Sequence, residues 1–229
     1  MDFSSRSDSL ELLDQPGIPA IDIQRNLYEL SIINQKLGGH GISITGFLGL
    51  AKKEKRIHVC EIGCGGGDNL KAIEKRAARF YSELSLTGID MNADCIHVAE
   101  KIKWNVPARF LVNDFKNVQF ETNPDILFCS LFCHHFKEEE LVNMFRWMFE
   151  NARSGFFIND LHRHPLAYHS IRLLTSVFSR SYLVKNDAPL SVLRGFKKKE
   201  LIALLKSAGI LNYSIHWKWA FRWLVIVHK

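Results

Sequence analysis

The chain has 229 residues, of which 47% are hydrophobic, and its formal net charge is +6. These values indicate one fairly large folded domain, or one domain with an inserted lid, and they exclude a largely disordered chain. No apolar run approaches the roughly 20 residues that a membrane-spanning helix requires.

The spacing of apolar residues predicts an alternation of helices and strands over most of the chain. Two N-terminal helices come first, then strands that each lead into a helix, which is the pattern of a parallel sheet with crossover helices. The predicted helices are Asp22–Leu37, Ser43–Lys53, Asp68–Phe80, Ala93–Trp104 and Lys137–Asn151, and the predicted strands are Ile57–Ile62, Leu84–Ile89, Ala108–Val112, Pro124–Ser130 and Gly155–Ile158.

The pattern changes after the fifth strand. Residues 161–189 open with several histidines, continue as a helix over about Leu166–Ser179, and end in a predicted polar loop. A helix over Lys198–Ala208 follows, and Tyr213–His228 alternates aromatic with polar residues as in a β-hairpin. We therefore expect one domain with four parts: an N-terminal helical cap (1–55), a ligand-binding core (56–160), an inserted lid (161–190) and a C-terminal helix with the hairpin (191–229).

A glycine-rich turn joins the first strand to its helix. Residues 61–67 read EIGCGGG, so Gly63, Gly65 and Gly67 lie where the backbone bends. Glycine suits such a turn because it adopts positive φ and lets the backbone approach a ligand. A dinucleotide-binding turn would carry a third glycine at position 68, where this chain has Asp68, and a carboxylate there is unsuited to a diphosphate.

Acidic or polar residues also follow the next strands. Asp90 and Met91 end the second strand, Asn113, Asp114 and Phe115 follow the third, and Ser130 ends the fourth. Since ligands of open α/β sheets bind at the carboxyl ends of the strands, we expect these residues to meet at one site. Asp90 can accept bonds from ribose hydroxyls, and Asp114 can accept one from an adenine amino group, with Phe115 beside the ring.

The order Glu61-x-Gly63-x-Gly65-x-Gly67, followed by these strand-end residues, resembles the motifs of class I S-adenosylmethionine-dependent methyltransferases. The resemblance implies a Rossmann-like, seven-stranded, mostly parallel sheet with an antiparallel C-terminal hairpin, N-terminal helices and a helical lid after the fifth strand. It implies S-adenosyl-L-methionine as cofactor, S-adenosyl-L-homocysteine as product and no metal. The cofactor-binding residues would be Glu61, Gly63, Cys64, Gly65, Gly67, Asn69, Asp90, Met91, Asn113, Asp114, Phe115 and Ser130.

The N-terminal helices and the segment DLHRHPLAYHSIRLL resemble bacterial methyltransferases that act on small lipophilic phenols, quinols and related natural products. This resemblance implies that Asn34 and Gly39 lie near the cofactor and that the lid covers the acceptor. Methylation of a phenol, whose pKa is near 10, benefits from a general base, most often histidine. Among the histidines after the fourth and fifth strands, we expect His135 or His162 to be that base; Tyr168 could orient the acceptor.

Other classes of function stay open. An RNA or protein methyltransferase would need an exposed basic groove, whereas the basic runs here lie at predicted helix ends. A non-catalytic S-adenosylmethionine-binding protein would bind the cofactor without turnover. A dehydrogenase is disfavoured by Glu61 and Asp68. We expect a monomer or homodimer with a small apolar acceptor.

The cysteines and the N-terminus indicate a cytoplasmic protein. Five cysteines, three of them in or beside apolar strands, predict buried free thiols in a reducing compartment. Cys129, Cys133, His134 and His135 match no zinc spacing, so no metal site is predicted. The first residues lack the apolar core of a signal peptide.

Overall fold

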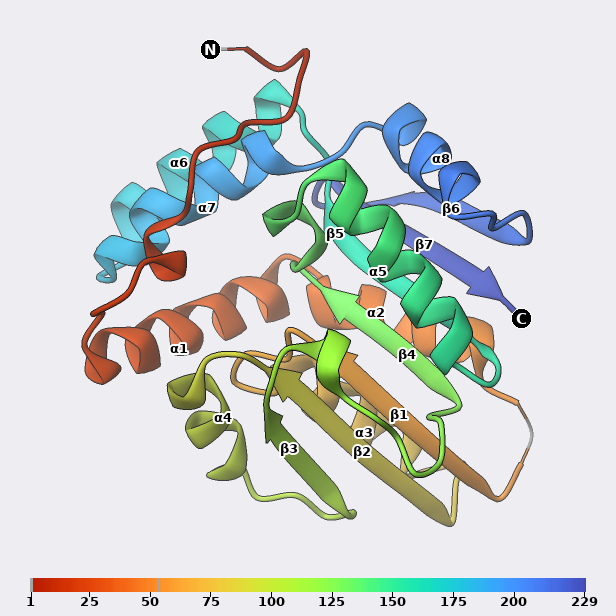
Figure 1. Ribbon diagram of the computed structural model, residues 1–229. Helices are drawn as coiled ribbons and strands as arrows, with labels where there is room; N and C mark the ends of the chain where they lie inside the picture. Colours follow the sequence, from red (N-terminus) through yellow and green to blue (C-terminus); the bar gives the residue numbers. More distant parts are fainter. Residues whose placement is uncertain (1, 53) are drawn as a thin grey trace.

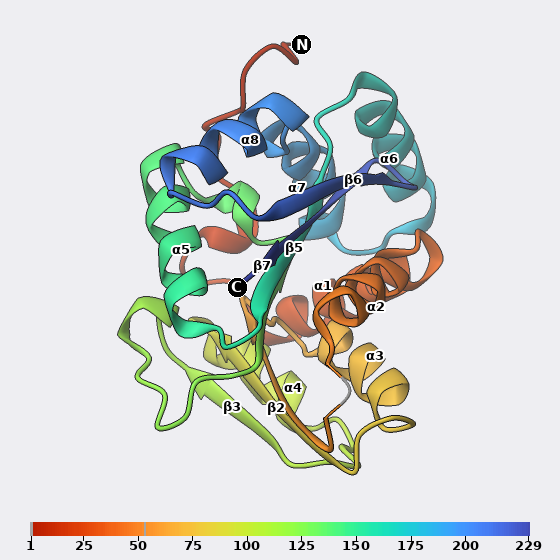
Figure 2. The same cartoon turned by 90° about the vertical axis from the view of Figure 1, so that its right-hand side faces the viewer.

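In the computed structural model, which describes residues 2–52 and 54–229, a central sheet is covered by helices on both faces (Figures 1 and 2). The strands are β1 (Arg56–Ile62), β2 (Glu83–Asp90), β3 (Ala108–Val112), β4 (Ile126–Ser130), β5 (Gly155–Leu161), β6 (Tyr213–Lys218) and β7 (Arg222–His228). The α-helices are α1 (Ala20–Lys36), α2 (Gly39–Leu50), α3 (Asp68–Ala77), α4 (Ala93–Glu100), α5 (Glu138–Asn151), α6 (Pro165–Phe178), α7 (Tyr182–Arg194) and α8 (Lys198–Ser207). Short 3-10 helices are η1 (Leu12–Asp14), η2 (Phe115–Asn117) and η3 (Cys133–His135).

The seven strands lie in the order β3-β2-β1-β4-β5-β7-β6. Strands β1 to β5 pair in parallel, and β7 pairs antiparallel with both β5 and β6. The predicted Rossmann-like sheet with a closing hairpin is therefore confirmed. The chain order reverses between β1 and β4, and at such a switch point a crevice forms at the carboxyl ends of the strands.

Apolar side chains form one core on each face of the sheet. Helices α5 and α8 cover one face, where Phe145 and Leu205 are fully buried, and α2 and α3 cover the other, where Phe47 and Ile73 are fully buried (Figure 2). Strands buried on both faces must be apolar throughout, and β4 is buried along its whole length. These two cores hold in place the carboxyl ends of the strands, where the candidate site lies.

Several predicted boundaries differ from the structure. Helix α2 begins at Gly39, because Gly38 adopts a left-handed conformation (φ 79°) that ends α1 and lets the next helix start directly. The prediction that this helix reaches Lys53 falls partly outside the described residues. Helices α3 and α4 end at Ala77 and Glu100, before the predicted Phe80 and Trp104.

The polar loop predicted after Ser179 is wrong, because these residues form α7. Ser181 caps this helix by accepting a hydrogen bond from the Val184 amide at 3.3 Å. Polar residues at 185–187 and Pro189 concealed the helix, but proline is accommodated within it, and Leu183 and Val192 are buried. The α6–α7 hairpin and the N-terminal segment lie at the end of the sheet to which the parallel strands point (Figure 1).

We expect Gly46→Ala to destabilise the fold by about 1–3 kcal/mol, the usual cost of overpacking a core. A Cβ atom at Gly46 would overlap the ring of Phe157, which is itself fully buried. Urea unfolding measures the change. Gly41→Ala is the matched control on the same helix: nothing lies within 4 Å of its added Cβ, so this variant should be as stable as the parent or more so. Equal effects at both positions would contradict the packing argument.

Candidate functional site

A cavity of about 1000 Å³ lies at the carboxyl ends of the strands. Its walls come from the N-terminal segment, α1, the loops after β1 to β4, and the α6–α7 hairpin. All of the predicted cofactor-binding residues except Gly67 line it: Glu61, Gly63, Cys64, Gly65, Asn69, Asp90, Met91, Asn113, Asp114, Phe115 and Ser130. The cavity therefore brings together side chains from four consecutive strand ends.

The glycine turn has the backbone that its sequence predicts. Gly63, Gly65 and Gly67 have φ values of 64°, 50° and 78°, in the left-handed region that favours glycine. A side chain at Gly63 would overlap the ring of Phe132, so the turn and the loop after β4 are in direct contact. Gly67 lies behind the cavity wall and precedes α3, where an added Cβ would meet Trp104. Its role is to join the turn to the helix.

Asp90 connects the glycine turn to the loop after β2. Its Oδ2 accepts a hydrogen bond from the Gly65 amide and its Oδ1 accepts one from the Asn92 amide, both at 2.9 Å. Burial raises the pKa of the Asp90 carboxyl. Asp114 also has a local role, since it accepts a bond from the Lys116 amide at 3.0 Å and caps η2. Asp90 and Asp114 both line the cavity in these positions.

Two ionisable side chains of opposite type line the cavity without a complete set of partners among the described residues. Among the described residues, no group bonds to Glu61 Oε2 or to Arg222 Nη1, although both atoms are buried. Burial raises the pKa of Glu61 well above its usual value, with Asp68 and Asp90 adding to the effect, and burial lowers the pKa of Arg222 to about 10. Leaving buried ionic groups unpaired is costly, so each is suited to a ligand group of opposite charge.

A network of buried polar groups holds Arg222 in position. Arg222 Nη2 donates to Asn34 Oδ1 at 2.9 Å, and Asn34 Nδ2 donates to Asp68 Oδ2 at 3.1 Å. His40 Nε2 lies 2.7 Å from the same Asp68 oxygen. Gly39 is needed here because an added Cβ would come within 3.0 Å of Arg222 and Asn34. Asn34 thus lines the cavity, and Gly39 lies directly behind it.

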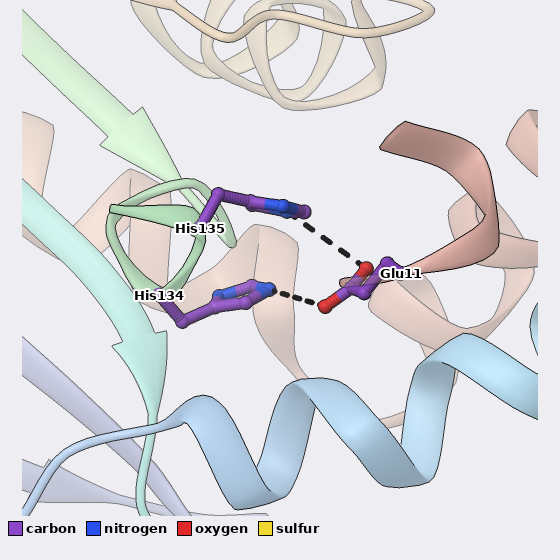
Figure 3. A group of neighbouring side chains, drawn as sticks. All are labelled: Glu11, His134 and His135. Atoms are coloured by element: carbon purple, nitrogen blue, oxygen red, sulfur yellow. Dashed lines mark ion pairs between the residues drawn. The ribbon is translucent and has the colours of Figure 1, made fainter. Parts of the chain in front are cut away.

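Two histidines after β4 line the cavity and point directly at Glu11 of the N-terminal segment (Figure 3). His134 Nδ1 lies 2.8 Å from Asp160 Oδ1, and its Nε2 lies 3.4 Å from Glu11 Oε1. His135 Nδ1 lies 3.1 Å from Asp14 Oδ2, whereas its Nε2 is 3.9 Å from Glu11 Oε2. The last contact is an ion pair that is too long for a hydrogen bond, so His135 Nε2 has no hydrogen-bond partner in the described part of the chain.

The two histidines differ in chemistry. Burial alone would lower the pKa of His134, but the carboxylates of Asp160 and Glu11 raise it to about 9. His134 is therefore a cation at neutral pH and cannot accept a proton there. Asp160 and Glu11 have lowered pKa values for the same reason: the charged imidazole favours their ionised forms.

In residues 2–52 and 54–229, Glu11, His134 and His135 are the one group of side chains placed closely enough to hold a metal ion (Figure 3). Each histidine already faces a carboxylate through Nδ1, and both face Glu11 through Nε2. These contacts account for the geometry of the cluster. Within the described chain, no other combination of side chains fits a metal.

We expect the stabilising effect of His134 to disappear at high pH. A raised pKa means that its contribution, on the order of 3 kcal/mol, is complete below about pH 6.5 and is lost as the pH rises through about 9. Urea unfolding of the parent and of His134→Gln across this range measures it: the difference in unfolding free energy should shrink with rising pH. A difference that stays constant from pH 6 to 10 would contradict a charged His134.

His162, the other predicted base, lies outside the cavity. Its amide donates to the Phe221 carbonyl, and its Nδ1 accepts a hydrogen bond from Trp217 Nε1 at 3.3 Å. Burial and the neighbouring His164 lower the pKa of His162 to about 4. Tyr168 also lies away from the cavity, buried against Phe3. The structure thus brings only His135 of the two expected bases to the site.

Sequence reasoning missed four charged residues that line the cavity: Glu11, Asp14, Asp187 and Arg222. Asp187 accepts hydrogen bonds from the Leu12 and Leu13 amides, which fixes η1 over the cavity. The one usable signal was Arg222, a charged residue in the apolar strand β7. The contacts of Glu11 and Asp14 depend on residues more than a hundred positions away and leave no local pattern.

The methyltransferase domain model matches residues 59–155. The plantazolicin methyltransferase BpumL in complex with SAH is similar in structure, with a TM-score of 0.65, 20% identity, and coverage of 90% of both chains. BpumL in complex with a triazolic desmethylPZN analog and SAH has a TM-score of 0.63 and 22% sequence identity, and the match covers 85% of this chain and 74% of that one. Magnesium protoporphyrin IX methyltransferase (ChlM) from Synechocystis PCC 6803 with bound SAH has a TM-score of 0.57 and 13% sequence identity, and the match covers 90% of this chain and 91% of that one. No curated protein sequence matches significantly.

Proposed function

We propose that this chain is an S-adenosylmethionine-dependent methyltransferase and that it methylates a phenolic or quinol oxygen of a small lipophilic acceptor; the match to the methyltransferase domain model over residues 59–155 supports the first part. The observation that carries this proposal is the placement of His135. His135, whose Nε2 has no hydrogen-bond partner among the described residues, lines the same cavity as the glycine turn and Asp90. A cavity of about 1000 Å³ is at the upper end of the usual range for ligand sites, so cofactor and acceptor fit together.

The cofactor half of the cavity fits a zwitterionic amino acid joined to a nucleoside. Glu61 Oε2 is suited to the ammonium group and Arg222 Nη1 to the carboxylate, because both atoms are buried and lack partners in the described chain. Asp90 and Asp114 are suited to the ribose and the adenine amino group. We therefore assign cofactor binding to the predicted residues that line the cavity, together with Arg222 and Asn34.

The acceptor half is apolar with a small number of polar groups. Phe132, Phe136, Ile171 and Val184 line it, as expected for a lipophilic ring or chain. The acids that line the cavity here, Glu11, Asp14 and Asp187, make it a poor site for a polyanion such as RNA. These features favour the small-acceptor reading over the RNA alternative.

His135 is the proposed general base. S-adenosylmethionine supplies a methyl group already activated by its sulfonium, so the protein has to place the nucleophile and remove its proton. Asp14 Oδ2 faces His135 Nδ1 at 3.1 Å and orients the ring, which leaves Nε2 to accept the phenolic proton. Asp14 is thus a positioning residue, and His134, held as a cation, has no base function.

A panel of acceptors tests the proposal. The purified chain is incubated with isotope-labelled S-adenosylmethionine and with hydroquinones and phenols of increasing alkyl length, short peptides, or RNA. We expect label in the phenols and hydroquinones, rising with chain length, and an O-methyl product by mass spectrometry and NMR. Label that appears only in peptide or RNA would overturn the proposed acceptor while leaving the methyltransferase intact.

A further inference from the structure

The outer face of α6 exposes a row of large apolar side chains. Their exposed fractions are Leu166 62%, Leu173 66%, Leu174 40%, Val177 64% and Phe178 78%. At 3.6 residues per turn these positions fall within one stripe roughly 140° wide. We call these five residues the α6 stripe. Leu173, Leu174, Val177 and Phe178 lie on adjacent turns, and exposed apolar side chains clustered in this way mark an interaction site more often than a free surface.

The same helix has a second apolar face. Ala167, Tyr168 and Thr175 are buried, and Ile171 lines the cavity. None of the five stripe residues is buried. The polar residues His169, Arg172 and Ser176 occupy the remaining narrow side, and the exposed Ser170 lies within the stripe. Because no other part of the described chain covers the stripe, its apolar character is not explained by packing within the fold.

The stripe is close to the rim of the cavity. Glu29 of α1 accepts hydrogen bonds from Ser179 Oγ and, at 3.0 Å, from the Arg180 amide, which ties the turn after α6 to α1. Beside Glu29, Tyr28 lines the cavity and is 68% exposed, and Tyr182 at the start of α7 is 50% exposed. Tyrosines of this kind suit a boundary between apolar and aqueous surroundings.

The charge of this region favours an anionic partner. Residues 161–186 contain Arg172, Arg180 and Lys185 and no aspartate or glutamate, and their fourth cation, Arg163, is buried and paired with Glu200. The acids that contact this segment from α1 are Glu29 and Asp22. Arg172, Arg180 and Lys185 are exposed. Two copies meeting through the stripe about a two-fold axis would bring these cations together, because the same patch is used twice. Anionic head groups would instead attract them.

We propose that the α6 stripe inserts into the head-group layer of an anionic lipid membrane, so that the cavity rim lies at the bilayer surface. The arrangement matches an interfacial amphipathic helix: large apolar side chains on one face with flanking arginine and lysine. The part of the inference that concerns delivery of a lipophilic acceptor from the bilayer rests on the proposed function, whereas membrane binding itself does not.

Co-sedimentation with lipid vesicles tests the binding. We expect the protein to bind vesicles of phosphatidylcholine and phosphatidylglycerol, to bind pure phosphatidylcholine more weakly, and to dissociate as salt is raised. The double variant Val177→Asn/Phe178→Ser should lower the partition coefficient by at least about tenfold, since it removes two inserted apolar side chains. Leu211→Ser is the matched control: Leu211 is 85% exposed but precedes β6, away from α6, and its loss should change nothing.

Binding of S-adenosylhomocysteine by calorimetry verifies that each variant is folded. Absence of binding to the phosphatidylglycerol vesicles, or equal binding by the double variant and the parent, would overturn the proposal. A dimer in analytical ultracentrifugation that the double variant loses would also overturn it, by showing that a second copy covers the stripe. Failure of every phenolic acceptor would overturn the proposed function and leave the vesicle result standing, so the two are distinguishable.

Discussion

Arg222→Met is expected to weaken the binding of S-adenosylhomocysteine by about 10- to 150-fold, the loss of a charged hydrogen bond of about 1.5–3 kcal/mol. The guanidinium is buried, lacks a partner at Nη1 within the described chain, and lines the cavity beside Asn34. Its proposed ligand is the cofactor carboxylate. Calorimetric titration measures the affinity.

A truncated ligand separates this role from a structural one. 5′-Methylthioadenosine retains the nucleoside and the thioether but lacks the amino-acid group, so its affinity should be unchanged in Arg222→Met. Arg109→Met is the control variant, because Arg109 is exposed on β3. An equal loss of affinity for both ligands would assign Arg222 to the fold and remove it from the carboxylate site.

His135→Gln is expected to reduce turnover by about 10²- to 10⁴-fold, the usual contribution of a general base. The affinity for S-adenosylhomocysteine should be unchanged, because His135 acts on the acceptor. Asp14→Asn should reduce turnover less, since it removes the carboxylate that orients the ring but keeps a hydrogen-bonding group at Nδ1. The measurement is the single-turnover rate with a hydroquinone that the acceptor panel has shown to be methylated.

The control for this pair is His97→Gln, an exposed histidine on α4. It should retain full turnover. Full turnover in His135→Gln would remove the proposed base, and a parallel loss of cofactor affinity would mean that the substitution distorts the loop after β4 instead.

The order of the sheet and the glycine turn were predictable because their signals are local. A strand of alternating or continuous apolar residues, a turn that requires positive φ, and an amphipathic helix each occupy a short stretch of sequence. The error at α7 has the same origin: Pro189 and three polar residues interrupt the local pattern, while the burial of Leu183 and Val192 stabilises the helix from outside it. Tertiary packing overrode the local preference.

The candidate site was predictable only where it consists of strand ends. His135 follows β4 directly and lines the cavity, whereas His162 does not because β5 continues three residues beyond the predicted end. In that extension Leu161 pairs with Arg222 of β7, and His162 is held by the Phe221 carbonyl. Pairing with the antiparallel strand β7 thus holds His162 outside the cavity and places Arg222 in the cavity wall. Neither effect is visible in the sequence near residue 162.

The N-terminal segment over the cavity has a kinetic consequence. Glu11 and Asp14 hold it through side chains, Asp187 holds the Leu12 and Leu13 amides, and Ser7 donates a main-chain bond to the Leu193 carbonyl. It joins no strand of the sheet, so it can swing aside while both apolar cores stay intact. Residues of this segment form part of the cavity wall, so we expect its opening to limit the rate at which S-adenosylhomocysteine leaves in each catalytic cycle.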